Sequence, residues 1–379
     1  MSGGVDSSVA AVLLREQGFE VVGCFMRLGS PGEHLDTLVP DAEVCETPRA
    51  GLKIGTRGCC SINDAADARL VAAQLGIPFY VCNFKKDFGR IIDYFVDEYA
   101  AGRTPNPCVR CNDWLKFGKL HEYAGQISAD FVASGHYARV EDGRLLRGVD
   151  VDKDQSYVLF GVPRERLGQM LLPIGGMRKP AVRELARVHG LPVFDKPDSQ
   201  EICFVPDDDY AGLVDRRRPE LAVEGPIVDA AGKVVGTHQG QHRFTIGQRR
   251  GVGVALGYPI YVIGKDPAAN TVTVGPAERL LATSCEAAEA NWLVDPSELA
   301  EPTRCLAQYR YNSDPVPAMV VALTGEPPSA GRNFSGRPGR LRVEFDEPQS
   351  ALTPGQALVI YGGPGNEGVL GGGWIDRVG

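Results

Sequence analysis

Apolar and polar residues alternate along the first half of the chain with two periods, one typical of strands and one typical of helices. An apolar run at 9–14 predicts a helix that ends at Gly18. The following pattern predicts strands at 20–28, 79–84 and 130–135, and helices at 65–76, 86–101 and 113–125. Strands that alternate with helices indicate an α/β fold with a parallel sheet.

The pattern then changes toward short strands and turns. The turn residues Glu141-Asp142-Gly143 predict a hairpin between strands at 138–140 and 144–146, and two short helices are expected at 163–171 and 179–189. From about residue 225 onward, apolar runs separated by turn residues predict small, mostly β domains, with a strand at 357–361. We therefore expect a catalytic α/β domain at 1–211, a small central β domain at 212–280 and a C-terminal β-barrel at 281–379.

Two stretches of the α/β region depart from this regular pattern. The segment 28–58 is rich in glycine, proline and acidic residues and has no period, which predicts a surface excursion. Only Met1 precedes the glycine-rich residues 2–8, although a buried strand normally leads into such a loop. We therefore expect that a first strand is missing from this sequence.

The composition is that of an ordinary globular protein, with 43% hydrophobic and 23% charged residues among 379. No apolar stretch reaches the ~18 residues of a membrane span and no signal-peptide pattern is present, so the cytoplasm is the expected location. The net charge of −8 disfavours a broadly basic nucleic-acid binder. A local positive groove remains compatible with it, and basic residues at 216–218 and 241–251 are the candidates.

Residues 2–8, SGGVDSS, form the most informative motif. Gly3 and Gly4 allow backbone N–H groups to approach an anion, and the positive end of the following helix would face it. Hydroxyls of Ser2, Ser7 and Ser8 would add donors, while Asp6 is placed to share an Mg²⁺ ion with phosphate oxygens. The motif predicts a loop that binds ATP and an enzyme that splits it between the α and β phosphates.

Ten cysteines in a chain expected in the cytoplasm do not indicate a disulfide framework. Cys24, Cys82 and Cys305 lie in apolar strand patterns and are interpreted as core residues. Cys108 and Cys111 form a C-x-x-C in a proline-stiffened loop that leads into the helix expected near Asp113. A helix N-terminus and the neighbouring Arg110 would favour the thiolate form, although half of a zinc site or a pair of inert thiols are the alternatives.

A further thiol, Cys203, lies in a polar run between Pro197 and Pro206. This setting favours a thiol that is presented on a loop over a buried core cysteine. An ATP-binding loop together with several such thiols suggests sulfur chemistry.

Several motifs, spread over nearly the whole chain, match those of one family in the same order. They are SGGVDSS at 2–8, GCCS at 58–61, TPNPCVRCN at 104–112, SGHYAR at 134–139, KDQSY at 153–157, DSQEICF at 198–204 and FTIGQRRG at 244–251. The set closely resembles the tRNA-specific 2-thiouridylases, within the PP-loop ATP pyrophosphatase superfamily. The resemblance implies an enzyme that uses ATP to replace O2 of the wobble uridine with sulfur, in tRNAs for Lys, Glu and Gln.

The resemblance also implies roles for individual residues. Cys203 would carry a persulfide and Cys111 would be its partner nucleophile. The ATP site would contain Ser2, Gly3, Gly4, Val5, Asp6, Ser7, Ser8, Met26 and Gly135. The tRNA would contact Asn106, Pro107, Cys108, His136, Lys153, Asp154, Gln155, Arg310, Tyr311 and Gln356. A cysteine desulfurase or a sulfur-carrier protein would supply the sulfur.

Cys108 is the main departure from the family pattern, because many members have aspartate there. With Cys111 and Cys203 it would make three soft ligands suited to a [4Fe–4S] cluster, which is an alternative sulfur route. Two other function classes remain open at this point. One is an amide ligase with the same ATP loop, and the other is a catalytically impaired tRNA-binding protein.

Overall fold

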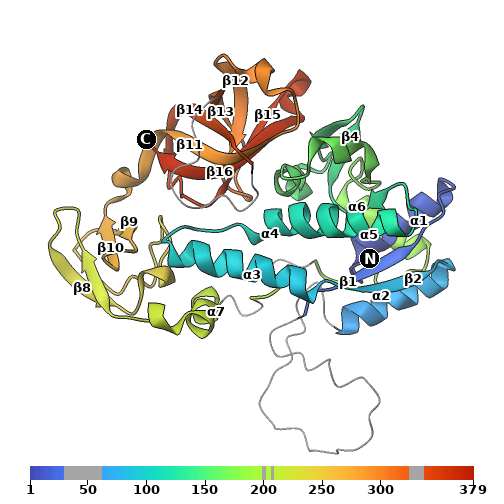
Figure 1. The fold of residues 1–379 in the computed structure, drawn as a ribbon, viewed down its shortest axis with the longest axis horizontal. Coiled ribbons are helices and arrows are strands. Elements are labelled where there is room, and N and C mark those ends of the chain that lie inside the picture. Colours follow the sequence, from blue (N-terminus) through green and yellow to red (C-terminus); the bar gives the residue numbers. More distant parts are fainter. Residues whose placement is uncertain (30–61, 199–201, 206–208, 324–336) are drawn as a thin grey trace, which may run out of the picture. The chain divides into compact units, whose positions relative to one another are not determined.

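The computed structural model describes residues 1–29, 62–198, 202–205, 209–323 and 337–379. It divides into two compact units, one of residues 1–88 and 180–209 and the other of residues 89–179 and 210–379 (Figure 1). Three expectations fall wholly or largely outside the described residues: the surface excursion at 28–58, the motif at 58–61, and residues 199–201 of the DSQEICF motif.

The first unit contains a parallel pair of strands with helices. α1 (Val5–Glu16) is followed by β1 (Gly23–Arg27), α2 (Ile62–Leu75), β2 (Phe79–Asn83) and most of α6 (Lys179–Val188). β1 and β2 pair in parallel, with Phe25 opposite Val81. The predicted alternation of strands and helices in this region is therefore confirmed, and the helices that precede these strands end at left-handed glycines, Gly18 and Gly76.

Two of the ten cysteines lie together on these strands. The Sγ atoms of Cys24 and Cys82 are 2.9 Å apart, and burial raises the pKa of Cys24 to about 12. Cys82 and Cys305 are buried as predicted, whereas Cys24 is half-buried.

In the second unit, the helical segment after α3 (Lys85–Ala100) differs from the helix expected at 113–125. It starts at Pro107 as α4 (Pro107–Arg110), continues as a π-helical stretch over Cys111–Lys119 and ends as α5 (Leu120–Gln126). The side chain of Asn106 caps this helix by accepting a hydrogen bond from Val109 N, and Pro107 has the fixed φ that suits a first helical residue. The C-x-x-C therefore lies inside the helix and not before it.

Other short elements of this unit partly match the predictions. The hairpin of β4 (Ala138–Glu141) and β5 (Arg144–Arg147) is confirmed, with Asp142 and Gly143 both at positive φ. The expected strand at 130–135 is reduced to β3 (Val132–Ala133), which pairs in parallel with β6 (Met170–Leu171). The region expected to be a helix at 163–171 is a 3-10 helix over Arg164–Gln169, so that prediction was wrong in type.

The β-rich part of the second unit follows α7 (Tyr210–Arg217) and contains a small sheet and a closed barrel. β7 (Gly225–Val228), β8 (Val234–His238), β9 (Tyr261–Asp266) and β10 (Thr271–Gly275) form the sheet, in the order β8-β7-β10-β9. The barrel strands are β11 (Leu281–Trp292), β12 (Thr303–Gln308), β13 (Val316–Leu323), β14 (Gly339–Ser350), β15 (Ala357–Gly362) and β16 (Gly368–Val378). Pairing of β11 with β16 closes the ring (Figure 1), which confirms the β-barrel expected at the C-terminus.

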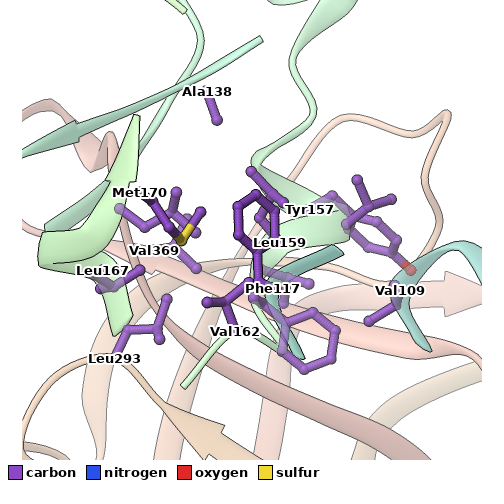
Figure 2. Close-up of a cluster of buried hydrophobic side chains, with 14 of the residues drawn as sticks. Val109, Phe117, Ala138, Tyr157, Leu159, Val162, Leu167, Met170, Leu293 and Val369 are labelled. Carbon is purple, nitrogen blue, oxygen red and sulfur yellow. The ribbon is translucent and has the colours of Figure 1, made fainter. Parts of the chain in front are cut away.

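One apolar cluster joins the C-x-x-C helix to the barrel. Val109 and Phe117 from the helix pack in it with Tyr157 and with the barrel-region residues Leu293 and Val369 (Figure 2). The helix therefore shares a core with the barrel. The three-domain boundaries expected from the sequence stay a prediction.

Within the described ranges, no helix combines the length and the apolar character needed to cross a membrane.

Candidate functional site

The glycine-rich loop 2–8 leads directly into α1. Gly4 is the N-cap residue and Asp6 lies in the first turn of this helix. Gly3 has φ +73°, and a Cβ placed on it would lie 2.2 Å from the carbonyl oxygen of Asp64. Only glycine fits this position, and the loop continues directly into the N-terminus of α1, the arrangement found in phosphate sites.

The hydroxyls of this loop have different environments. Ser8 is buried and donates to Gly4 O at 2.8 Å, so its hydroxyl stabilises the helix start. Ser2 Oγ and Ser7 Oγ lie 3.1 Å apart at the more exposed surface of the loop. Ser2 and Ser7 are therefore better placed than Ser8 to meet a phosphate oxygen.

Lys196 holds this loop from the side. Its ammonium donates to Gly3 O at 2.9 Å and to carboxylate oxygens of Asp64 and Asp67, each at 2.6 Å. Burial acts to lower the pKa of Lys196, but the hydrogen bonds to Asp64 and Asp67 outweigh it and the pKa is raised. The charged lysine therefore fixes the backbone of the loop to the start of α2. Lys196 was not among the predicted site residues.

Met26 and Cys203 are the other predicted site residues of the first unit. Met26 lies in β1 opposite Cys82. Cys203 is half-buried in a turn closed by a hydrogen bond from Val205 N to Ile202 O at 2.9 Å. Phe204 beside it is buried and packs edge-on against Phe88. The anchored Phe204 therefore leaves the neighbouring thiol on a turn, which agrees with the loop setting expected from the sequence.

Cys108 and Cys111 of the second unit lie one turn apart on the helix that Asn106 caps. Cys108 is exposed in the first turn, and Cys111 is half-buried at the start of the π-helical stretch. The positive helix end therefore acts most directly on Cys108.

Arg110 was expected to activate these thiols, and its contacts favour another role. The side chain is 1% exposed and its Nη2 donates to Glu289 Oε2 at 2.9 Å. A guanidinium neutralised by a buried carboxylate is a weak source of positive potential for a neighbouring thiol. The contacts indicate that Arg110 links the helix to the barrel.

Ser134, Gly135 and His136 follow β3, and the ring of His136 lies 6.2 Å from that of Phe117 on the same helix. His136 is buried, its Nδ1 lies 2.6 Å from Ser134 Oγ, and its Nε2 lies 3.5 Å from Lys116 Nζ. Burial, and then the charge of Lys116, hold the pKa of His136 well below 6.5. The imidazole is therefore neutral at pH 7, and the ammonium of Lys116 assigns the proton to Nδ1. Lys116 was also missed from the sequence, since one lysine on an amphipathic helix carries no motif.

Several predicted tRNA contacts lie together around the C-x-x-C helix. Burial is the first cause of the raised pKa of Tyr311, and Cys108 and Gln155 lie close enough to contribute to it. The Tyr311 ring also lies 5.9 Å from that of Tyr157, whose hydroxyl donates to Ala357 O at 2.7 Å. The structure thus brings Cys108, Gln155 and Tyr311 into one neighbourhood.

The remaining predicted tRNA contacts surround this neighbourhood or support it. Asp154 accepts hydrogen bonds from Arg147 Nε, Gly148 N and Ser156 N, so its carboxylate shapes the loop after the half-buried Lys153. Residues just before Gln356 meet the TPNP segment, where Thr104 N donates to Pro354 O at 2.9 Å.

Arg310 lies beside the FTIGQRRG motif. Its Nη2 donates to Ser350 O at 3.3 Å and to Ala351 O at 3.0 Å. A Cβ placed on Gly247 of the motif would lie 3.9 Å from the same nitrogen. The structure therefore brings part of the central β region next to a predicted tRNA contact.

In the part of the chain that the structure describes, no three His, Cys, Asp or Glu side chains converge as metal ligands. Asp6, in the first turn of α1, has the oxygen ligands that suit Mg²⁺.

Comparisons with known proteins cover the whole chain. Three family models match in succession: the tRNA methyl transferase HUP domain at 1–207, the tRNA methyl transferase PRC-barrel domain at 213–276 and the aminomethyltransferase β-barrel domain at 282–375. The tRNA-specific 2-thiouridylase MnmA of Rhodopirellula baltica is 49% identical, covering 99% of this chain and 94% of that protein.

Two further relatives carry the same name. The protein of Geobacter metallireducens is 46% identical over 99% of this chain and 95% of its own length. That of Carboxydothermus hydrogenoformans is 45% identical over 100% of this chain and 96% of its own length. On the strength of these full-length similarities, the chain belongs to the tRNA-specific 2-thiouridylase (MnmA) family.

Proposed function

We propose that this chain is an ATP-dependent tRNA uridine 2-sulfurtransferase that converts the anticodon wobble uridine to 2-thiouridine. Full-length similarity to MnmA proteins supports the reaction class. The observation that carries the residue assignment is the position of Cys108. It shares one capped helix with Cys111 and lies near Gln155 and Tyr311. Thiols set among polar and aromatic side chains suit a flipped base that reacts with sulfur.

The chemistry begins with adenylation. O2 of the uridine attacks the α-phosphate of ATP, the bond to the β-phosphate breaks and diphosphate leaves. Backbone N–H groups of the loop 2–8 and the N-terminus of α1 stabilise the phosphate charge. Asp6 is the residue that would hold Mg²⁺, which neutralises phosphate charge when bound. This step converts O2 into the leaving group AMP.

Sulfur transfer follows. The terminal sulfur of a Cys203 persulfide attacks C2, and AMP leaves. The Cys111 thiolate then attacks Sγ of Cys203, the S–S bond to the substrate sulfur breaks, and 2-thiouridine is released. A disulfide between Cys111 and Cys203 remains, and a cellular dithiol must supply two electrons to reopen it.

The test is thiolation of unmodified tRNA by the purified protein with Mg-ATP and a sulfur donor. Thiolated tRNA migrates slowly in a gel that contains an organomercury compound. Cys203→Ser should abolish the slow band, and Cys111→Ala should abolish multiple turnover. Cys305→Ser is the matched control, because Cys305 is buried within the barrel and should leave the band unchanged. A full-strength band from Cys203→Ser with every sulfur donor would refute both sulfur routes.

The [4Fe–4S] route is the alternative for the same product. It requires Cys108, Cys111 and Cys203 together as ligands, whereas the persulfide route does not need a thiol at 108. Iron and acid-labile sulfide should be measured in protein purified without oxygen, together with thiolation by Cys108→Asp. The persulfide route predicts little cluster and an active Cys108→Asp. Near-stoichiometric cluster that is lost in this variant would establish the other route.

Several finer points belong to the same proposal. The substrates are wobble-uridine tRNAs for Lys, Glu and Gln, the sulfur comes from a cysteine desulfurase or a carrier protein, and the reaction occurs in the cytoplasm. We also propose that the three functional domains occupy residues 1–211, 212–280 and 281–379. The amide ligase and the impaired tRNA-binding protein are disfavoured, because full-length relatives are named as thiouridylases.

A further inference from the structure

Arg110, which lies between Cys108 and Cys111 in the sequence, carries a buried charge. Arg110 and Glu289 have side chains that are 1% and 4% exposed, and the Nη2 to Oε2 distance is 2.9 Å. The guanidinium also lies 4.0 Å from the ring centre of Trp374 and 5.0 Å from that of Tyr94. Burying a charge is unfavourable unless it is paired, so the contacts of Arg110 form a dedicated site for it.

The backbone on the other side of this pair is distorted. Glu289 has φ +51° in the middle of β11. The registers of β11 with β14 and with β16 both shift around this residue. Positive φ is uncommon for glutamate, and a bulge in a strand re-aims a side chain. The strand thus keeps an unfavourable conformation at the residue that reaches Arg110, which indicates a functional constraint.

Other contacts from the barrel end in the same part of the unit. Arg337 pairs with Asp113 at 3.1 Å and donates to Gly161 O at 2.8 Å. Asn291 Nδ2 donates to Phe160 O at 2.6 Å and to Val162 O at 2.8 Å. The barrel therefore holds the C-x-x-C helix and its neighbouring segment at several points.

We infer that Arg110 and Glu289 are positioning residues for the sulfur-transfer site, and that the C-terminal barrel sets the direction in which the helix presents Cys108 and Cys111. Cys111 follows Arg110 directly, so a change in the depth or rotation of the Arg110 backbone moves the Cys111 thiol. The assignment of Cys111 as the nucleophile rests on the proposed function. The link between barrel and thiol does not, because it can be measured without tRNA.

The first measurement is the rate at which iodoacetamide alkylates Cys111 across pH. After the reaction the protein is unfolded and cut with trypsin. Cleavage after Arg110 places Cys108 and Cys111 in different peptides, so mass spectrometry follows each thiol separately. Glu289→Gln removes the charge of the carboxylate. Glu289→Asp keeps the charge, but its side chain is one methylene shorter, so the carboxylate lies farther from Arg110. Aspartate also tolerates positive φ better than glutamate, so this second variant preserves folding.

Glu286→Gln is the matched control. Glu286 lies on the same strand and pairs with the buried Arg340 at 2.6 Å, within the barrel. A purely structural role for Glu289 predicts that the two Glu289 variants lose stability while Cys111 alkylation equals that of Glu286→Gln, at a temperature where all three variants are folded. Positioning predicts that both Glu289 variants change the alkylation rate or its pH midpoint, by about threefold or more in rate, while Glu286→Gln does not.

The second measurement is single-turnover thiolation of tRNA by the same variants. Displacement of a reacting group by 1 Å costs about 100-fold in rate, so Glu289→Gln should be strongly impaired. Altered alkylation with no thiolation by the wild type would sustain the positioning role and refute the proposed function. Wild-type thiolation, with both Glu289 variants matching Glu286→Gln in both measurements, would overturn the inference.

Discussion

Gly3 and Lys196 fix the shape of the loop that would receive the phosphates of ATP. Glycine is required at position 3 by its φ of +73° and by the nearby backbone of Asp64, and Lys196 then holds the Gly3 carbonyl. The glycines of the motif are readable from the sequence because backbone conformation is a local property. Lys196 is not, because it reaches the loop from far along the chain.

Gly3→Ala should weaken ATP binding by at least about tenfold, because the added Cβ collides with backbone that cannot turn away. Calorimetric titration with a non-hydrolysable ATP analogue measures this. Gly76→Ala is the control, since Gly76 also has a positive φ of +63° but nothing lies within 4 Å of its Cβ position. It should lower stability and leave binding unchanged. Equal binding by the two variants would contradict the assigned role of the loop.

His136 gives the protein a predictable response to acid. Its pKa in the folded state is well below the 6.5 of an unperturbed histidine, because of burial and then Lys116. Below pH 6.5 the unfolded chain binds a proton that the folded chain excludes, so this contribution to stability is present above pH 6.5 and is lost as the pH falls. Where only the unfolded chain is protonated at this histidine, the free energy of unfolding falls by about 1.4 kcal/mol for each pH unit of acidification.

This expectation is checked by urea unfolding of the wild type and of His136→Gln between pH 5 and 8. The difference in unfolding free energy between the two should change with pH only below about 6.5. Since His238 and His242 remain in both proteins, the comparison isolates His136. Parallel curves over the whole range would show that folding leaves the pKa of His136 unchanged, and would contradict this expectation.

At the scale of elements, the helix of the C-x-x-C begins six residues earlier than the sequence pattern predicts. The apolar periodicity starts only after Cys111, whereas the helix starts at Pro107 because Asn106 and Pro107 form its cap. The strand expected at 130–135 was too long for a different reason. Only Val132 and Ala133 have a partner strand, β6, and pairing partners distant in sequence cannot be read from periodicity.

Asn106→Ala should cost about 1 kcal/mol of stability through loss of the cap and should also change the reactivity of Cys108 in the first turn. Asp295→Ala is the control, because Asp295 caps a short helix of the barrel region by accepting from Ser297 N at 2.9 Å. Thermal unfolding and iodoacetamide labelling are the measurements. A change of Cys108 labelling in both variants, or in neither, would argue against control of this thiol by its own helix cap.

The sequence motifs locate most candidate site residues, because thiols, glycines and their neighbours occur in short, recognisable runs. The motifs do not reveal which of their residues would contact a ligand and which stabilise the surrounding structure. Ser8, Asp154 and Arg110 lie in or next to the motifs, yet their side chains mainly bond to the protein itself. Glu289 carries no motif at all, and only the pairing of distant segments identifies it.

At the scale of the whole molecule, the barrel and the C-x-x-C helix share one hydrophobic core. The interior of the barrel contains a second hydrophobic core, formed by barrel residues. The shared cluster contains Tyr94, Val109 and Phe117 together with Val359 and Trp374. The separate cluster inside the barrel is formed by residues 285–375 alone. The C-x-x-C helix therefore depends on the barrel for its core, whereas the barrel depends less on the helix.

This asymmetry predicts the behaviour of fragments. A fragment of residues 1–280 would expose the shared cluster and leave Arg110 without Glu289, so it should aggregate or remain partly unfolded. A fragment of residues 281–379 keeps its interior and should be the better folded of the two. Circular dichroism measures the folding of each fragment, and size-exclusion chromatography measures whether it is monomeric or aggregated. A monomeric, cooperatively unfolding 1–280 fragment would contradict the shared core.

Closure of the barrel by β16 against β11 has a consequence for biosynthesis. Trp374 lies on that closing strand and packs on Arg110, so the pocket for this arginine cannot form until the strand has left the ribosome. At about 5–20 residues per second, this leaves the thiol-bearing helix waiting for on the order of ten seconds or more. During that interval the apolar surface of Val109 and Phe117 lacks the barrel residues that bury it in the folded protein.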